Sequence, residues 1–461
     1  MLKTLGAVAG AAGTAKLLSA CGDPPTTLAG PGTIDTFVFL MMENRSYDHY
    51  MGARSMLEGE KSDGLRPEMS NLDINGDEVR VWPATGDGLC VGSPPHGWPT
   101  SRAQLGDGAN DGFLTIHQSP EDLNIDPMQY LTREHLPVLN ALADSYTSCD
   151  RWFSSLLGPT LPNRMYWHAG TSNGSRNNRE VLEGGFKNVE TIYHRLDSAG
   201  VDWAYYYSDV AVLGVLDDID LGTRIRRFLY DFIDEAAAGT LPPVSYIDPA
   251  FSWNDDHPPR HPLLGQQLMA AVYQALATSP QWERCMLVVT YDEHGGFFDH
   301  VVPGRAPDEF AEQDFDQLGF RVPSFIVGPY VKQGYVSSVQ YDHTSALKHL
   351  ENEFDLAPLS MRTTAANDLR DAIDFDRLAA RQPSAPVTLP AVEIDDSMLP
   401  DACTGESSVG QATSGHDHDV LEWADAVDLG RWDRRAQVRE YGHDLAEYLD
   451  KHNLGRIRRR R

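Results

Sequence analysis

The densest group of reactive side chains in the sequence is the segment 292–300, which reads DEHGGFFDH. It holds three carboxylates and two histidines within nine residues and directly follows the apolar run 286–291. Carboxylates and imidazoles bind metal ions and transfer protons, and so many titratable groups at a strand end are unusual in a structural network. The two glycines also allow the backbone to approach a ligand closely. The residues expected to take part in metal or acid–base chemistry here are Asp292, Glu293, His294 and His300.

Glu43 and Asn44 form a second candidate group because they follow another apolar run, residues 34–42. Carboxylate and amide oxygens are suitable ligands for a hard cation. The same pair of residue types is also common where a strand ends in a capped turn. Taken alone, these two residues leave both interpretations open.

Thr160 is the candidate nucleophile, in the segment 158–164 that reads GPTLPNR. Pro162 suits the first turn of a helix, so Thr160 would lie close to the exposed backbone N–H groups of a helix start, which favour a phosphate oxyanion. The alternative is that Thr160 merely caps that helix. Spacing alone favours the cap.

Three further histidines, His96, His257 and His343, are each flanked by loop-forming residues. Single histidines more often fill the surface or the core than take part in catalysis, so each needs support from other evidence. The His-Asp-His sequence at 416–418 could bind a metal ion. It lies in an irregular stretch, and we expect it to be solvated.

The order of the predicted elements favours an α/β fold. Apolar runs typical of strands alternate with stretches in which apolar residues recur at helical spacing. The predicted strands are residues 34–42, 203–207, 244–247, 286–291 and 322–327, and the predicted helices are residues 191–198, 225–238 and 262–278. This alternation predicts a mainly parallel central sheet with helices on both faces. Ligands bind at the carboxyl ends of the strands in such folds, which is where residues 43–44 and 292–293 stand.

Composition divides the chain into four parts. Residues 1–21 have a basic start, an Ala/Gly-rich middle and small residues before Cys21, which resembles a bacterial lipoprotein signal. Residues 22–33 read as a linker, 34–381 as the catalytic domain, and 382–461 as an irregular connection, a charged helical segment and a basic tail. We expect export to the periplasm, cell envelope or exterior, with a lipid anchor at Cys21. A cytoplasmic protein with an Ala-rich terminus is the alternative, and the natural start could also lie upstream of Met1.

The bulk properties exclude several classes of partner. A net charge of −29 argues against nucleic-acid binding, because a phosphate backbone would be repelled. No apolar run approaches the roughly 20 residues that a membrane span needs. Oligomeric state is not indicated.

Four cysteines besides Cys21 would allow two disulfide bridges in an exported protein, with the pairing left open. They are Cys90, Cys149, Cys285 and Cys403. Cys285 begins an apolar run and is expected to be a small buried hydrophobe.

Six motifs together resemble the bacterial phosphoesterase family that contains non-haemolytic phosphatidylcholine phospholipases C and related acid phosphatases. They are residues 42–50 (MENRSYDHY), 158–164 (GPTLPNR), 256–258 (DHP), 290–300 (TYDEHGGFFDH), 321–323 (RVP) and 342–345 (DHTS). They occur in the family's order and span about residues 34 to 375.

This resemblance implies an alkaline-phosphatase-like α/β fold and a divalent metal ion of unspecified identity. It implies metal ligation by Glu43, Asn44, Asp292 and Glu293, with Thr160 near the metal as the nucleophile in place of the serine of the acid phosphatases. The histidines that the resemblance makes candidates for holding phosphate oxygens or protonating the leaving group are His96, His257, His294, His300 and His343.

A phospholipase C-type phosphodiesterase is the function that these residues predict, with a phosphate ester such as a phospholipid as substrate. The threonine at the nucleophile position resembles the phospholipase branch more than the phosphatase branch. The alternatives are a phosphomonoesterase of the acid phosphatase type and a lipoprotein that binds a metal or ligand without turnover.

Overall fold

The computed structural model of the chain describes residues 32–85, 89–216, 219, 222–395, 420 and 434–458. The predicted export signal with Cys21, most of the linker, Cys403 and residues 416–418 lie outside the described residues. No helix in the described ranges is long and apolar enough to cross a bilayer. Cys90 is disulfide-bonded, whereas Cys149 and Cys285 are free and buried, as expected for Cys285.

Eight strands form one central sheet, and all of them except β11 run in the same direction. In spatial order they are β12 (Tyr335–Ser337), β6 (Thr147–Cys149), β11 (Phe325–Val327), β10 (Cys285–Tyr291), β1 (Thr36–Met42), β9 (Val244–Ile247), β7 (Trp203–Tyr207) and β8 (Ile225–Arg227). The predicted α/β fold with a mainly parallel sheet is confirmed. Residues 225–238 differ from the prediction, because they begin with edge strand β8 and become α-helical only at Ile233.

The two central strands are apolar along their whole length because both of their faces are covered. Every residue of β1 and of β10 is buried, as expected for parallel strands between two helical layers. Their register pairs Thr36 with Cys285 and Met42 with Tyr291, so the two strands end at the same level. Residues 43–44 and 292–293 therefore leave the sheet side by side.

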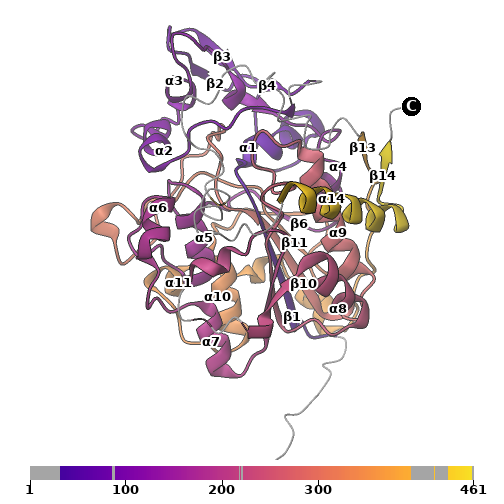
Figure 1. Cartoon of the computed structure of the whole chain (residues 1–461). Helices are drawn as coiled ribbons and strands as arrows, with labels where there is room; N and C mark the ends of the chain where they lie inside the picture. The colour runs from indigo at the N-terminus through magenta and orange to yellow at the C-terminus, as the bar shows by residue number, and fades with distance from the viewer. Residues whose placement is uncertain are drawn as a thin grey trace, which may run out of the picture.

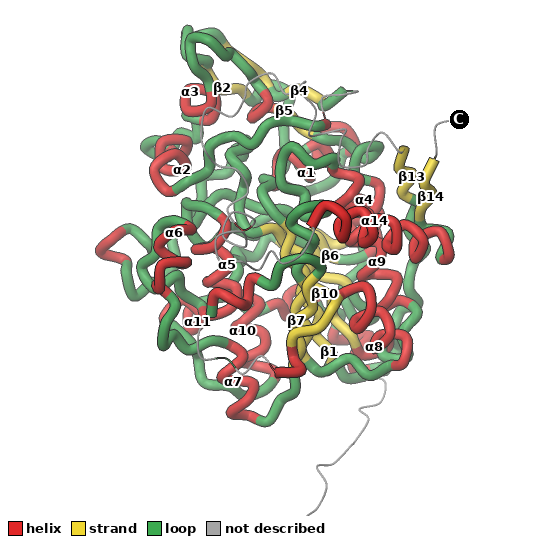
Figure 2. Tube along the Cα trace, in the orientation of Figure 1, coloured by secondary structure: helices red, strands yellow, loops and turns green. Residues whose placement is uncertain are grey.

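Helices cover both faces of the sheet (Figures 1 and 2). One layer contains α5 (Thr160–Ala169), α7 (Ile192–Ala199), α10 (Thr344–Glu353) and α11 (Met361–Ala365). The other contains α4 (Pro137–Ser145), α8 (Ile233–Ala238), α9 (Pro262–Ala277) and α14 (Arg434–Lys451). The apolar spacing of residues 262–278 thus predicted α9 correctly.

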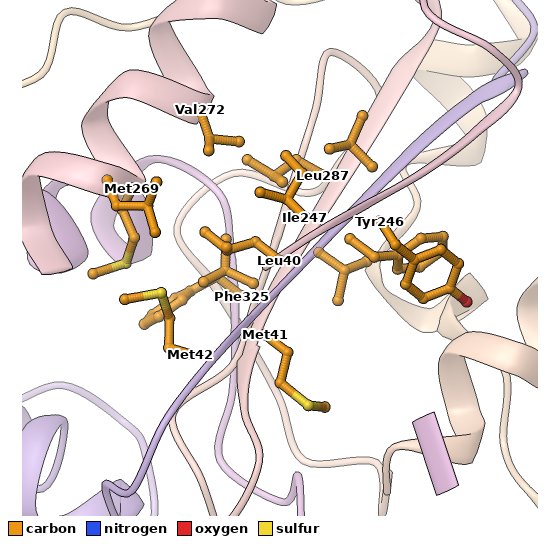
Figure 3. Packing of buried hydrophobic residues seen from close by; sticks show 14 of the residues in the cluster. Leu40, Met41, Met42, Tyr246, Ile247, Met269, Val272, Leu287 and Phe325 are labelled. Atoms are coloured by element: carbon orange, nitrogen blue, oxygen red, sulfur yellow. The ribbon is translucent and has the colours of Figure 1, made fainter. Parts of the chain in front are cut away.

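The core lies between the sheet and these layers (Figure 3). Leu40 and Met42 of β1 point toward Met269 of α9, while Met41 points to the opposite side with Tyr246. This alternation follows from the two-residue period of a strand. Complete burial of a side chain such as Leu40 contributes about 2 kcal/mol relative to exposure.

A smaller layer covers the edge of the sheet at which β1 ends (Figure 1). It has an apolar cluster of its own that includes Leu65, Phe113, Phe298 and Phe320. Its elements are α1 (Tyr47–Tyr50), η1 (Arg54–Glu58), β2 (Ser70–Leu72), β3 (Glu78–Arg80), β4 (Trp82–Pro83), α2 (Trp98–Leu105), α3 (Phe113–His117), η3 (Asp126–Met128) and β5 (Gln129–Tyr130).

The remaining short elements lie between the others or near the C-terminus. They are α6 (Asn178–Glu180), η4 (Val181–Gly185), η5 (Val212–Val215), η6 (Gly222–Arg224), η7 (Phe228–Phe232), η8 (Trp282–Arg284), η9 (Ala311–Gln313), η10 (Leu369–Ala372), α12 (Phe375–Ala379), β13 (Val392–Asp395) and β14 (Gly455–Arg458). The predicted charged helix is present as α14. The start of the basic tail, however, pairs as β14 in parallel with β13.

Candidate active site

The ends of β1 and β10 bring the two predicted acidic pairs together. The backbone N–H of Asn44 donates to Asp292 Oδ1 at 3.0 Å, and the N–H of Glu293 donates to the same oxygen at 2.7 Å. Asn44 has a φ of 59°, a left-handed conformation that asparagine tolerates better than most residues. All four side chains are buried. The expected cluster at the carboxyl edge of the sheet is therefore present.

Thr160 is the first residue of α5, and its hydroxyl Oγ1 donates to Glu43 Oε1 at 3.2 Å. The helix is preceded by Pro159 as N-cap, which makes no capping hydrogen bond. An N–H of the first turn, that of Leu161, is instead satisfied by Asn178 Oδ1 at 2.7 Å. The capping interpretation of Thr160 is therefore wrong, because its hydroxyl is directed at the acidic cluster.

Arg164 is a site residue that the sequence analysis missed. It lies one turn after Thr160 on the same face of α5. Its Nε donates to Asp292 Oδ2 at 3.2 Å, and its Nη1 donates to Asp248 Oδ1 at 3.4 Å. A third bond joins Nη2 to the Met42 carbonyl at 3.2 Å. The four-residue spacing from Thr160 was the available signal.

Asp255 was also missed, although it lies next to the DHP motif. Its backbone carbonyl accepts from the N–H of Glu43 at 2.8 Å, and its carboxyl is hydrogen-bonded to that of Glu43. Arg260 Nε lies 3.5 Å from Asp255 Oδ1. The loop after β9 therefore adds another carboxylate to the cluster.

Burial and mutual repulsion shift the pKa values of these carboxyls upward. Burial, followed by the charges of Asp292 and Asp255, raises the pKa of Glu43 well above its usual range. Burial raises the pKa of Asp292 to about 7, against the opposing attraction of Arg164. Such shifts mean that the cluster holds more negative charge than its surroundings stabilise.

The donor set fits a hard cation. Four carboxylates, those of Glu43, Asp255, Asp292 and Glu293, are buried here. Arg164 contacts Asp292, and Arg260 contacts Asp255. Asn44 Oδ1 and Glu293 Oε1 are buried and have no hydrogen-bond partner among the described residues. Buried acceptor oxygens are costly without a partner, and a divalent cation would satisfy them.

His96 and His257 flank this cluster, with ring centroids 6.3 Å apart. His96 Nε2 lies 3.3 Å from Asn44 Nδ2 and 3.8 Å from Glu293 Oε1, while its Nδ1 is 2.7 Å from the Pro94 carbonyl oxygen. The backbone N–H of His257 donates to Asp255 Oδ1 at 3.0 Å. Both of these predicted histidines are therefore at the site.

His294 contacts the side chain of Glu293, and His343 contacts the backbone of Asp292. His294 Nδ1 is 3.2 Å from Glu293 Oε2, and its Nε2 is 2.8 Å from Gln104 Oε1. His343 Nε2 is 2.7 Å from the backbone carbonyl oxygen of Asp292, and its Nδ1 accepts from Trp152 Nε1 at 3.4 Å. Burial lowers the pKa of His343 to about 4. A neutral ring in this position orients the backbone of residue 292.

His300 lies in a second cluster. Its Nδ1 is 2.6 Å from Asp48 Oδ2 and its Nε2 is 3.1 Å from Asp63 Oδ1. Ligand atoms of Asp48, Asp299 and His300 lie within 4.8 Å of one another, which could hold a metal ion. Arg321, however, already donates to Asp48 Oδ1 at 3.1 Å and to Asp299 Oδ1 at 2.9 Å. The structure thus separates Asp299 and His300 from Asp292, Glu293 and His294, and places them in an ion-pair network with Asp48 and Arg321.

Comparison with protein families gives a match to the model described as Phosphoesterase family over residues 34–357. Non-specific phospholipase C6 of Arabidopsis thaliana is 31% identical over 406 residues, which cover 78% of this chain and 75% of that protein. Phospholipase C A of Mycobacterium tuberculosis strain H37Rv is 32% identical over 407 residues, covering 74% of this chain and 77% of that protein.

Solved structures resemble the chain more distantly. A protein in the alkaline phosphatase superfamily from Vibrio parahaemolyticus covers 74% of this chain and 70% of its own, with 10% identity and a TM-score of 0.36. The phosphonate monoester hydrolase of Agrobacterium radiobacter covers 74% of this chain and 77% of its own, with 10% identity and a TM-score of 0.36.

Proposed function

The chain belongs to the phosphoesterase family and is a hydrolase of phosphate esters, and we propose that it is a metal-dependent phosphodiesterase of the phospholipase C type with Thr160 as its nucleophile. The observation that carries the proposal is the hydrogen bond of 3.2 Å from Thr160 Oγ1 to Glu43 Oε1. It directs the hydroxyl of a helix-start threonine toward a buried acidic cluster that fits a cation.

A divalent cation would be held by Glu43, Asn44, Asp292 and Glu293, close to Thr160. When bound, it would supply positive charge that lowers the pKa of the alcohol and neutralises charge on the phosphoryl group. The excess of buried carboxylates and the unsatisfied oxygens of Asn44 and Glu293 support this assignment. Oxygen-rich ligation favours calcium or magnesium, while the neighbouring histidines would admit zinc or iron.

The protein residues then divide the reaction between them. Glu43 accepts the hydrogen bond of Thr160 and so fixes where the nucleophilic oxygen lies. In the proposed first step, the Thr160 hydroxyl loses its proton, the bond from Thr160 Oγ1 to phosphorus forms in line with the ester bond that breaks, and the leaving diacylglycerol oxygen takes up a proton. The intermediate is a phosphodiester that joins Thr160 to the head group. Water then cleaves its bond to Thr160, which returns the hydroxyl and releases the phosphorylated head group.

The surroundings of Thr160 offer groups that would stabilise the transferring phosphoryl group. In the first turn of α5, the N–H of Leu161 is bonded to Asn178 Oδ1, that of Asn163 to the Pro159 carbonyl oxygen, and Pro162 has none, so the helix start offers a phosphate oxygen at most the N–H of Thr160 itself. His96 and His257, which flank the cluster, are placed to hold phosphate oxygens or to protonate the leaving group.

The diester substrate is favoured by the names of the relatives, which include phospholipases C from a plant and from a bacterium. We propose a phospholipid or a similar phosphodiester as substrate, hydrolysed to diacylglycerol and a phosphorylated head group. We also propose that the chain is exported, with a lipid anchor at Cys21. The disulfide of Cys90 supports an oxidising compartment.

The test compares wild type, Thr160→Ala and Thr160→Ser on phosphatidylcholine, p-nitrophenyl phosphorylcholine and p-nitrophenyl phosphate. We expect release of phosphocholine from the diesters, a loss of about 10³-fold or more in kcat for Thr160→Ala, and partial activity for Thr160→Ser. Thr278→Ala is the matched control, since Thr278 bonds only within the end of α9. Retention of more than about a tenth of kcat by Thr160→Ala would contradict the nucleophile assignment.

A further inference from the structure

The C-terminal helix α14 contacts the loop that supplies Asp255 and His257, although α14 lies beyond the residues matched by the family model. Tyr441 of this helix has a hydroxyl oxygen that accepts from Asn254 Nδ2 at 3.2 Å and is hydrogen-bonded to Ser208 Oγ at 3.2 Å. Burial raises the pKa of this hydroxyl to about 12. The helix is the yellow one beside α9 in Figure 1.

Gly442, the next residue of α14, allows the helix to lie close to the same loop. A Cβ at this position would be 2.5 Å from Cζ2 and 2.8 Å from Cε2 of Trp253. Trp253 is 3% exposed, so its ring has little room to move away. Two consecutive residues of α14 therefore contact two consecutive residues of the loop, Trp253 and Asn254.

The contacts of Tyr441 lead directly to the acidic cluster. Asn254 precedes Asp255, whose carbonyl accepts from Glu43 and whose carboxyl is hydrogen-bonded to it. On the other side, Ser208 Oγ donates to the carbonyl oxygen of Asp248 at 3.3 Å. Through Ser208, the Tyr441 hydroxyl thus joins residue 248, at the beginning of the loop, to residue 254, which precedes Asp255.

The first half of this loop has an anchor of its own. Asp209 accepts from the backbone N–H groups of Phe251 and Ser252, each at 2.9 Å. The loop therefore does not depend on α14 for its basic conformation. Asn254 Oδ1 also accepts from the backbone N–H of Ala250 at 2.9 Å, so α14 adds a second hydrogen bond, from Asn254 Nδ2 to Tyr441, that fixes the other end of this side chain.

We propose that Tyr441 is a positioning residue for the phosphoesterase site, holding Asn254 so that Asp255 stays hydrogen-bonded to Glu43. This inference rests on the proposed function, because Glu43 orients the nucleophile there. Tyr441 touches neither the nucleophile nor the carboxylates, and it acts through Asn254. Residues outside the family match thereby become part of the support of the active site.

Tyr441→Phe tests the proposal in the full-length chain, because it removes one hydroxyl and keeps the packing of the ring. We expect kcat to fall about fivefold with KM changed less than about twofold, since the lost contact aligns the reacting groups rather than binding substrate. Tyr448→Phe is the matched control, because Tyr448 lies on the same helix and its ring contacts that of His452, with centroids 4.6 Å apart. It should retain the wild-type kcat.

Two further measurements separate positioning from general stability. Hydrogen exchange should become faster in a peptide covering residues 250–257 of Tyr441→Phe, while the thermal midpoint stays within about 3 °C of wild type. In a double-mutant cycle, Ser208→Ala should lower kcat less in the Tyr441→Phe background than in wild type. Both substitutions remove the same hydrogen bond, the one between Ser208 and the Tyr441 hydroxyl.

All rates are measured on whichever ester, choline diester or p-nitrophenyl phosphate, wild type hydrolyses faster, so a failure of the diester proposal leaves this test intact. Unchanged kcat in Tyr441→Phe would overturn the inference, even if hydrogen exchange increased, because the hydroxyl would then be structural only. An equal loss in Tyr448→Phe would also overturn it, since the helix as a whole would be responsible.

Discussion

The backbone of Asn44 occupies the space that a side chain on Gly295 would need. A Cβ on residue 295 would be 2.2 Å from the carbonyl oxygen of Asn44 and 3.0 Å from its Cα. Gly295 also has a φ of 64°, which favours glycine. The turn after β10 therefore packs directly against the end of β1. This contact fixes residues 292–293 relative to residues 43–44.

Gly295→Ala should abolish most of the activity. Because the obstructing atoms belong to the backbone, Asn44 must shift, and a displacement of about 1 Å in a catalytic group can cost roughly 100-fold in rate. Gly200→Ala is the matched control, since Gly200 has a similar φ of 69° with no atom within 4 Å of the added Cβ. The control should lose only about 1 kcal/mol of stability and keep kcat. Comparable kcat for both variants would show that the approach to Asn44 is unimportant.

Glu43→Gln should weaken metal binding. Wild type is expected to lose activity with EDTA, to regain it with a divalent cation, and to melt at a higher temperature when the cation is added, because binding to the folded state stabilises it. Because a charged ligand is lost, the cation concentration that gives half of the maximal stabilisation should rise by about tenfold or more. Glu351→Gln is the control, a buried glutamate whose Oε1 accepts from Leu359 at 2.9 Å. Equal cation dependence of the two variants would exclude Glu43 as a ligand.

Local sequence predicted the part of the fold in which each strand is long and apolar. Residues 34–42 and 286–291 could be recognised because both faces of β1 and β10 are buried, and their polar ends predicted the site. Strands β6 and β12 are three residues long and contain serine or threonine, so no periodicity could reveal them. The antiparallel direction of β11 depends on its long connection from β10, which leaves no local signal.

The sequence predicted those residues of the candidate site that are neighbours in the chain. It missed those that only the fold brings to the cluster. Asp255 lies in the loop after β9 and contacts Glu43, and Arg164 lies on α5 and contacts Asp292. Neither residue directly follows a strand that the sequence predicted. His300 is the opposite case, a neighbour in the motif that the fold places elsewhere. Six residues beyond His294 and after two glycines with positive φ, it lies against Asp48 and Asp63.

Asp256→Asn should remove part of the pH dependence of the free energy of unfolding. Burial raises the pKa of Asp256 to about 7, although Arg45 and a hydrogen bond from Tyr291 oppose the shift. A carboxyl whose folded pKa is raised stabilises the fold below its unfolded pKa, near 4, and that contribution is lost as the pH rises through about 7. The free energy of unfolding of wild type should therefore fall relative to the variant by roughly 1 kcal/mol per pH unit in this window.

Chemical denaturation of both proteins in EDTA at pH 4.5, 6 and 7.5 measures this difference. Asp73→Asn provides a control of opposite sign, because backbone hydrogen bonds from Asp77 and Asn75 lower the pKa of this exposed carboxyl. Its stabilising contribution is present above the unfolded pKa and is lost only as the pH falls, so its difference from wild type should stay constant between pH 6 and 7.5. A constant difference for Asp256→Asn between pH 6 and 7.5 would mean that Asp256 is already ionised in the fold at pH 6, which contradicts the raised pKa.

His96→Asn and His300→Asn should separate catalysis from stability. His96 Nε2 lies beside Asn44 and Glu293, so its loss should lower kcat/KM by about 100-fold with little change in thermal midpoint. His300 pairs with Asp48, which raises the pKa of His300. Its replacement should cost about 2 kcal/mol of stability, because Asp48 and Asp63 each lose a hydrogen bond to the ring, with kcat/KM within about threefold of wild type. Kinetics at saturating cation, together with urea unfolding, measure both effects, and a large kcat/KM loss in a stable His300→Asn would return His300 to the catalytic group.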